Sequence, residues 1–252
     1  MISWILRDCE DPPCLGSSQK FQYSLRKKVK RPHAQGMGLE TMKQKLSIAS
    51  YALLHALAIL TGSVILGLHT RVLYYRFIPK IQSFNEAYSG AMIRKNYDLL
   101  IDYLNPFYRG DLVLHELPMS PQGAFHFYEV KVIFDLVYGL FLVTFLLSLF
   151  FYFRNKKRKT LGYLKGAAAL TFILPVLLSI PFLLDFSRAF VVFHELAFSN
   201  DYWIFDPRID PVIKILPEWF FMYAAFLILV YMILFALGTY YLGKKQTKKF
   251  TS

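Results

Sequence analysis

Two stretches of this sequence combine imidazole and carboxylate groups beside long apolar runs. The first, Ala124–Asp135 (AFHFYEVKVIFD), carries His126 and Glu129, and the second, Phe193–Glu218 (FHELAFSNDYWIFDPRIDPVIKILPE), carries His194. A neutral histidine is the usual general base near physiological pH, and two of them at one site can divide the base and acid roles. An ionisable group beside a bilayer is costly and therefore marks a candidate functional site. We accordingly predict that His126 and His194 form an acid/base pair.

Other polar side chains near the two histidines are candidates for assisting them. Glu129 follows His126 by three residues and so shares a helical face with it, where its carboxylate can orient the ring or hold a substrate amine. Asn200 is a candidate donor to a developing oxyanion, and Asp206 is a further candidate for assisting the pair. The remaining candidates for support or substrate binding are Lys131, Trp203 and Glu218.

Several of these residues also have a simpler interpretation. Lys131 and Asp135 are spaced as an i,i+4 ion pair that anchors a helix at the membrane interface, and Trp203 is typical of an interfacial anchor. On composition alone, the whole second stretch is equally well a solvated loop. The functional interpretation is favoured because the topology argued below places both histidine stretches on the same side of the membrane.

The chain is too apolar for an ordinary soluble domain. Of its 252 residues, 55% are hydrophobic, 17% are aromatic and only 18% are charged, which is typical of an integral membrane protein. The net charge of +12 reflects 29 Lys and Arg against 17 Asp and Glu. Most basic clusters flank apolar runs, as topology signals do, so we expect no nucleic-acid partner.

Four apolar runs are each about as long as a helix needs to cross a hydrocarbon core of about 30 Å. They are Leu46–Leu68, Val132–Phe153, Leu161–Leu184 and Phe220–Leu242. Basic segments precede the first run, separate the second from the third and follow the fourth, and the positive-inside rule places such segments in the cytoplasm. We therefore predict an all-α polytopic membrane protein with four transmembrane helices and both termini cytoplasmic. Two extracytoplasmic loops then carry the two histidines.

The predicted domain is a single transmembrane unit over residues 46–243. We expect residues 1–45 to be a basic, disordered cytoplasmic tail or an extension, and residues 244–252 to be a second basic tail. Between the first two runs, Thr70–Val130 has the pattern of a long outer loop. Within that loop, Tyr97–Leu104 has the apolar spacing of a short interfacial helix.

Prolines and a histidine mark special positions in and near the apolar runs. Pro175 and Pro181 predict that the third helix is kinked or broken near its outer end, and Pro207 and Pro211 predict an extended connection beyond it. His55 lies inside the first run. A proton relay is one interpretation of His55, and a core histidine bonded to a neighbouring helix is the favoured one.

Familiar catalytic signatures are missing from the sequence. There is no GxSxG nucleophile elbow and no HExxH zinc motif, since His194 and Glu195 lack the second histidine. Cys9 and Cys14 have no His or Cys cluster beside them, and the rest of the chain has no thiol. We predict no cofactor and no metal ion, and acyl transfer here would need a nucleophile that the substrate supplies.

The spacing of the four predicted spans, together with three segments of the chain, resembles the lipoprotein intramolecular transacylase family of low-GC Gram-positive bacteria. The segments are FHFYEVK at Phe125–Lys131, FHELAFSNDYWIFDP at Phe193–Pro207 and LPEWFF at Leu216–Phe221. His126 and Lys131 match the family pattern, whereas Glu129 stands where Asp is usual. The resemblance implies an acyltransferase at the outer face of the cell membrane, with diacylated lipoproteins as substrates and membrane lipids around it. An acyl chain of the S-diacylglyceryl group on the N-terminal cysteine would move to that residue's own α-amino group, giving a lyso-form lipoprotein.

That reaction agrees with the residues, because the substrate's amine is the nucleophile and the protein need supply only a base and donors for the oxyanion. The donor ester is already tethered to the amine, so alignment supplies much of the rate. The alternative is a non-enzymatic membrane protein that binds a metal ion or a partner at its outer face through the same histidines and carboxylates. A transporter is less favoured, because four spans with almost no central charge offer little pathway.

Overall fold

The computed structural model describes residues 17–157 and 161–249, and every regular element in these residues is a helix. The chain divides into a unit over Met1–Ala49 and a second unit over Ser50–Ser252, and the second unit carries all the candidate site residues. Along the chain the elements are α1 Ser17–His69, α2 Arg71–Phe84, α3 Gly90–Tyr103, α4 Pro121–Lys157, α5 Tyr163–Leu184, α6 Phe186–Ala197, the 3-10 helix η2 Pro211–Lys214 and α7 Glu218–Lys249.

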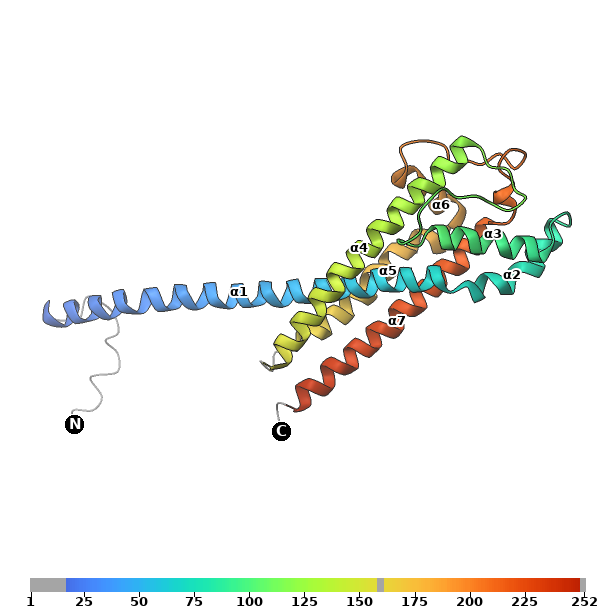
Figure 1. The fold of residues 1–252 in the computed structure, drawn as a ribbon. Coiled ribbons are helices and arrows are strands. Elements are labelled where there is room, and N and C mark those ends of the chain that lie inside the picture. The colour runs from blue at the N-terminus through green and yellow to red at the C-terminus, as the bar shows by residue number, and fades with distance from the viewer. Residues whose placement is uncertain (1–16, 158–160, 250–252) are drawn as a thin grey trace. The chain divides into compact units, whose positions relative to one another are not determined.

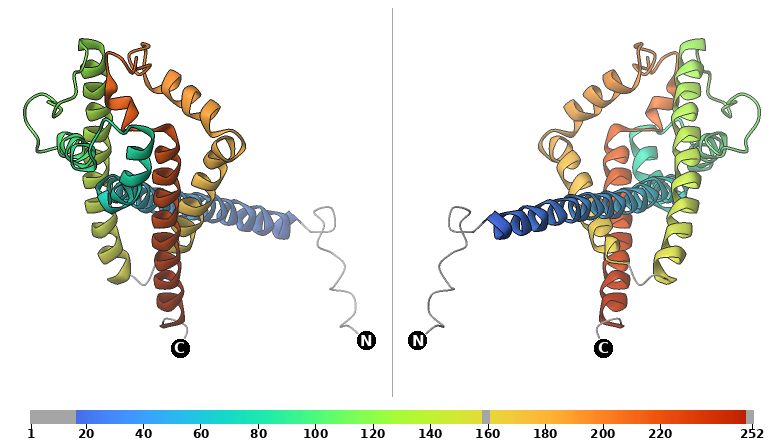
Figure 2. Two further views of the ribbon diagram at one scale, coloured as in Figure 1. Left: turned by 90° about the vertical axis from the view of Figure 1, so that its right-hand side faces the viewer. Right: turned by 90° about the vertical axis from the view of Figure 1, so that its left-hand side faces the viewer.

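Three helices in the described residues are long and apolar enough to cross a membrane. They are Met42–His69 of α1, Pro121–Lys157 of α4 and Glu218–Lys245 of α7. The third predicted span corresponds to α5, whose apolar stretch Tyr163–Leu177 is shorter. Figure 2 shows α4 and α7 running lengthwise through the second unit. The all-helical membrane fold is therefore confirmed.

The segment Thr70–Val130, which the sequence indicates as a long loop, is largely helical. α2 and α3 occupy much of it, and α4 begins well before its own apolar run. The physical reason is amphipathicity, since α2 and α3 each bury one face, including Tyr74 and Tyr97, and expose the other. The short helix expected at Tyr97–Leu104 is the C-terminal half of α3.

The N-terminal part of α1 lies ahead of the first apolar run. α1 begins at Ser17, so residues 17–45 are described as part of the same helix as that run, and the basic cytoplasmic tail over residues 1–45 stays a prediction. The two cysteines, Cys9 and Cys14, lie outside the described residues.

The chain breaks rather than kinks beyond the prolines of α5. Asp185 takes an extended backbone conformation between α5 and α6, and its carboxylate accepts a hydrogen bond from the Arg188 amide, so Asp185 caps the N-terminus of α6. The connection expected to be extended near Pro211 contains η2 instead, because proline at the first helical position has its backbone angle preset for a helix. After the break at Asp185, the second histidine stretch returns to α4, which it contacts through Asn200 and Asp210.

An aromatic core holds α2, α3, η2 and the start of α7 together at one end of the second unit (Figure 1). Tyr74 stacks on Tyr97 with ring centroids 3.7 Å apart, and Phe220 meets Tyr74 edge-on at 5.0 Å. The Tyr74 hydroxyl donates to the Ile215 carbonyl at 2.6 Å, which satisfies a phenol that would otherwise be costly to bury. Phe127 of α4 belongs to the same core, so this packing fixes the start of α4.

His55, which is half-buried, joins the apolar helices of the second unit. Its Nδ1 is hydrogen-bonded to Ser148 of α4, its Nε2 lies 3.4 Å from the Thr239 hydroxyl of α7, and its ring meets Tyr163 of α5 edge-on at 6.4 Å. Polar contacts of this kind hold membrane helices together, because an unpaired polar group in hydrocarbon is costly. The favoured interpretation of His55 as a core histidine bonded to a neighbouring helix is confirmed.

Replacing His55 should therefore loosen the bundle. We expect His55→Ala to lower the free energy of unfolding by roughly 1–3 kcal/mol, because it removes two polar contacts and leaves a cavity. Thermal unfolding of the detergent-solubilised protein measures the change. The control is His115→Ala, whose ring is 39% exposed, and equal melting temperatures for the two variants would contradict the structural role.

Candidate active site

The two histidines predicted from separate stretches are neighbours in the structure. His126 lies in the second turn of α4 with only 6% of its surface exposed, and His194 lies in the last turn of α6. Their ring centroids are 6.2 Å apart with an interplanar angle of 36°. This separation allows one reacting group to contact both rings, as an acid/base pair requires.

Aromatic rings surround the histidine pair. Phe198 lies against both imidazoles, with centroids 4.7 Å from His126 and 5.7 Å from His194. Phe205 contacts His126 at 5.5 Å, and Trp203 contacts His194 at 4.9 Å. Apolar walls strengthen every charge interaction made inside them. Trp203, interpreted from the sequence as an interfacial anchor, is thus part of this wall.

Sequence reasoning did not identify Phe198 and Phe205 as site residues. Phe198 follows His194 by four residues, so a helix over this stretch would have placed both on one face. Phe205 carried no comparable signal, because it lies in the irregular segment between α6 and η2 and reaches His126 only through the tertiary fold.

A backbone hydrogen bond sets the tautomer of His194. Its Nδ1 lies 2.7 Å from the Phe190 carbonyl, and a carbonyl can only accept, so Nδ1 carries the proton and Nε2 keeps its lone pair. Burial lowers the pKa of His194 below its usual value, although the bond to Phe190 opposes the shift. His194 is therefore held neutral, with Nε2 free to accept a proton.

Glu129 and Asn200 link α4 to the segment that follows α6. The Asn200 side-chain amide donates to Glu129 Oε1 at 2.9 Å, and Asn200 Oδ1 accepts from the Tyr202 amide at 3.0 Å. Among the described residues, neither Glu129 Oε2 nor His126 Nδ1 has a hydrogen-bond partner, although both atoms are buried. Buried polar atoms are nearly always paired, so two unpaired ones at one site call for a ligand or water.

A buried carboxylate holds the second stretch against the start of α4. Asp210 is 5% exposed and accepts hydrogen bonds from the Ser120 amide at 2.6 Å and from the Ser120 hydroxyl at 2.7 Å. The same hydroxyl accepts from the Gly123 amide at 2.9 Å and so caps α4. A Cβ on Gly123 would lie 2.6 Å from Asp210 Oδ1, so only glycine permits this approach.

The other predicted site residues engage partners outside the histidine pair. Lys131 donates to the Asn105 carbonyl at 3.0 Å and lies 3.5 Å from Asp135, as the i,i+4 spacing predicted. The remaining contacts are an ion pair between Asp206 and Arg208 at 2.6 Å and a hydrogen bond from Ser187 to Glu218 at 2.5 Å. Hydrogen bonds from Arg208 lower the pKa of Asp206 to about 2.

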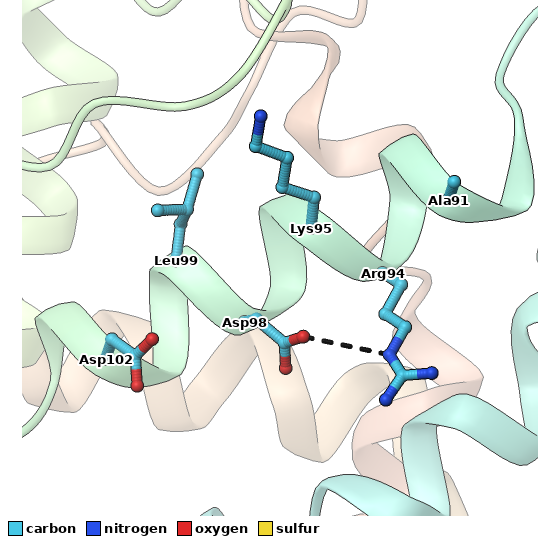
Figure 3. A pocket seen from close by; sticks show the side chains of 6 residues that line it. All are labelled: Ala91, Arg94, Lys95, Asp98, Leu99 and Asp102. Atoms are coloured by element: carbon cyan, nitrogen blue, oxygen red, sulfur yellow. Dashed lines mark ion pairs between the residues drawn. The ribbon is translucent and has the colours of Figure 1, made fainter.

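No three His, Cys, Asp or Glu side chains gather as a metal site would need in the part of the chain that the structure describes. A separate open pocket runs along α3, where Arg94 is ion-paired with Asp98 at 3.9 Å (Figure 3). Its lining residues are Ala91, Arg94, Lys95, Asp98, Leu99 and Asp102. None of them contacts either histidine of the pair, so this pocket is distinct from the candidate site.

Members of one known protein family are similar to this chain. A model of lipoprotein intramolecular transacylase Lit matches residues 49–221. A solved structure of the membrane integral transacylase Lit from Bacillus cereus is 34% identical with a TM-score of 0.79, covering 83% of this chain and 98% of that one. Two structures of that protein with one histidine replaced, by arginine or by alanine, have TM-scores of 0.76 and 0.77 at 33% identity. They cover 86% and 85% of this chain and 97% and 98% of their own. No curated protein is similar enough to count as a match.

Removing the Asp210 carboxylate should release the segment between α6 and η2. We expect Asp210→Ala to lower the free energy of unfolding by about 1–3 kcal/mol, because the Ser120 amide and hydroxyl both lose the carboxylate that accepts their hydrogen bonds. Limited trypsin digestion should also cleave after Arg208 faster. Asp201→Ala, an exposed aspartate of the same segment, is the matched control, and indistinguishable digestion of the two variants would refute the anchoring role.

Proposed function

The chain belongs to the lipoprotein intramolecular transacylase family, and we propose that its His126–His194 pair catalyses the family's reaction. As an acyltransferase of this family, it moves an acyl chain from the S-diacylglyceryl group of a bacterial lipoprotein's N-terminal cysteine to the α-amino group of the same cysteine. The product is a lyso-form lipoprotein. The observation that carries the site assignment is the 6.2 Å approach of two imidazoles from separate segments.

For this reaction the protein must transfer protons and align the amine with the ester, and it need not supply a nucleophile. The substrate's amine nitrogen attacks the ester carbonyl carbon, the new N–C bond forms, and the ester C–O bond breaks. The proton lost by the amine ends on the glycerol oxygen, so no external acid or water is consumed. Because donor and acceptor belong to one molecule, holding them in contact supplies much of the rate.

The two imidazoles divide the proton transfers. His194 presents an unprotonated Nε2, because its Nδ1 donates to the Phe190 carbonyl, and this nitrogen is suited to take the amine proton. His126, close beside it, is placed to accept that proton at one ring nitrogen and to release a proton from the other to the leaving glycerol oxygen, so that both rings end neutral. The aromatic wall excludes water from both steps, which prevents hydrolysis of the ester.

The supporting residues act through position. Asn200 ties the segment after α6 to Glu129 of α4, and its second amide hydrogen is the candidate donor to the oxyanion. Trp203 holds the ring of His194. The residues that secure the surrounding segments are Lys131, Asp206 and Glu218.

The topology we propose has four spans, with α5 as the third span in chain order, both termini in the cytoplasm and the site at the extracytoplasmic face. α4 supports it, because this helix of 37 residues is longer than a hydrocarbon core requires and ends in Arg154, Lys156 and Lys157. The histidine site lies at its opposite end. Diacylated lipoproteins would then approach from the outer leaflet, among membrane lipids.

Replacement of either imidazole tests the assignment. We expect His126→Gln and His194→Gln each to reduce formation of lyso-form lipoprotein by at least about 100-fold, because general acid/base groups contribute this much. Mass spectrometry of a lipoprotein's N-terminal peptide, from cells that express each variant, measures the product. His115→Gln serves as the control, and normal product levels in both single mutants would remove the pair from the mechanism.

The protonation state of His194 can be measured directly. Its pKa is lowered by burial, so its ring should stay neutral as the pH falls through about 6.5, the ordinary histidine value, and gain a proton only at lower pH. Ring resonances of histidine-labelled enzyme, assigned by comparison with His194→Gln, report this titration. A midpoint at or above the ordinary value would show that the ring is not held ready as a base.

A further inference from the structure

One carboxylate oxygen in the site has no role in the chemistry described above. Glu129 Oε1 accepts a hydrogen bond from Asn200 at 2.9 Å, and this bond fixes the carboxylate plane. Its other oxygen, Oε2, is buried and has no partner among the described residues. In addition, no Lys or Arg side chain among the described residues forms an ion pair with Glu129. A buried acceptor of this kind is costly unless a donor reaches it.

We propose that Glu129 Oε2 is the binding site for the substrate's α-amino group and makes the enzyme specific for lipoproteins with a free N-terminus. The inference rests on the proposed function, because it concerns the same site. His126 lies one turn earlier on α4, on the same helical face, and its buried Nδ1 also lacks a partner. Two unfilled polar atoms on one face define a place for a small polar group of the substrate.

The charge of the site selects a cationic group. An α-amino group has an ordinary pKa of about 7.7–8.0, so it arrives mainly as an ammonium ion at neutral pH. Glu129 supplies the opposite charge, whereas an ester or a peptide carbonyl has no donor to offer to Oε2. An N-acylated terminus lacks the positive charge and one or more of the hydrogens, so it fits this site poorly.

The same contact orients the nucleophile after deprotonation. A neutral amine keeps two hydrogens, and donating one to Oε2 directs its lone pair away from Glu129. The ammonium first releases one proton to bulk solvent. As the lone pair of the amine forms the N–C bond and the ester C–O bond breaks, one of the two remaining hydrogens leaves as a proton to His194 and reaches the glycerol oxygen by way of His126. Once the nitrogen is acylated it is no longer a cation, so the product has lost the feature that held the substrate.

Binding of a non-reactive ligand tests this specificity. The probe is a synthetic lipopeptide with an S-dialkylglyceryl (ether) cysteine, which cannot transfer an acyl chain, made with a free and with an acetylated N-terminus. We expect the purified enzyme to bind the free-amine probe about ten-fold or more tightly, the scale of one charge-assisted hydrogen bond. Glu129→Gln should bind both probes equally, and Glu129→Asp should keep a preference.

Two comparisons separate this proposal from the catalytic one. Glu195→Gln, which removes an exposed carboxylate beside His194, should keep the wild-type preference. His194→Gln should also keep the preference while losing turnover, so failure of the catalytic assignment would not mimic failure of the amine site. A Glu129→Gln enzyme that still prefers the free amine would overturn the proposal.

A measurement on the unaltered enzyme avoids any folding defect of the variants. A carbodiimide joins an amine directly to a carboxylate without a spacer, so a bound free-amine ether probe should couple to Glu129 of the wild-type enzyme in preference to exposed carboxylates, and the acetylated probe, which has no amine to couple, is the control. Peptide mapping by mass spectrometry locates the new amide bond. Coupling to other carboxylates with none at Glu129 would overturn the proposal.

Discussion

The contact of Phe198 with both imidazoles is the interaction on which the site depends. A single aromatic ring lies 4.7 Å from His126 and 5.7 Å from His194, and so fills the space beside a pair that comes from two distant segments. The carboxylate of Asp210 secures the same arrangement from the other side by binding the N-terminal cap of α4. The packing of Phe198 and the hydrogen bonds of the buried Asp210 therefore hold the two histidine stretches together as one site.

A site of this kind suits a reaction whose reactants are already joined. The substrate brings both the nucleophile and the ester, so the protein needs no serine or cysteine nucleophile and gains most from alignment. Rings that surround the histidines limit water and leave His194 neutral. The fixed carboxylate of Glu129 adds a position for the amine, and the aromatic core beneath it gives the end of α4 the rigidity that such positioning requires.

His55 and the His126–His194 pair show how the hydrogen bonds of an imidazole decide what it does. His55 is bonded to Ser148 and approached by Thr239, so both of its nitrogens are occupied and it serves to join helices. His126 keeps a buried nitrogen without a partner, and His194 uses only one nitrogen for the backbone. Available nitrogen atoms, rather than the presence of histidine, distinguish the proposed catalytic pair from the structural residue.

The sequence by itself determined the membrane class, the apolar helices, the family and the two histidines. These follow from composition, from hydrophobic run length and from residue type in short motifs, all of which are local properties of the chain. It also indicated the favoured role of His55, because an isolated polar residue in an apolar helix must find a partner on a neighbouring helix.

Only the tertiary structure decided which side chains meet. The helices α2 and α3 form because an aromatic core buries one face of each. From the sequence, most of the long segment between the first two apolar runs had the pattern of a loop. Phe205 and Asp210 reach α4 from an irregular segment that has no periodicity to reveal its direction. Asn200 was a candidate oxyanion donor in the sequence, yet its bond to Glu129 depends on the break in the chain at Asp185 and on the irregular segment between α6 and η2. Contacts between segments far apart in sequence depend on how the chain turns, which residue types alone do not specify.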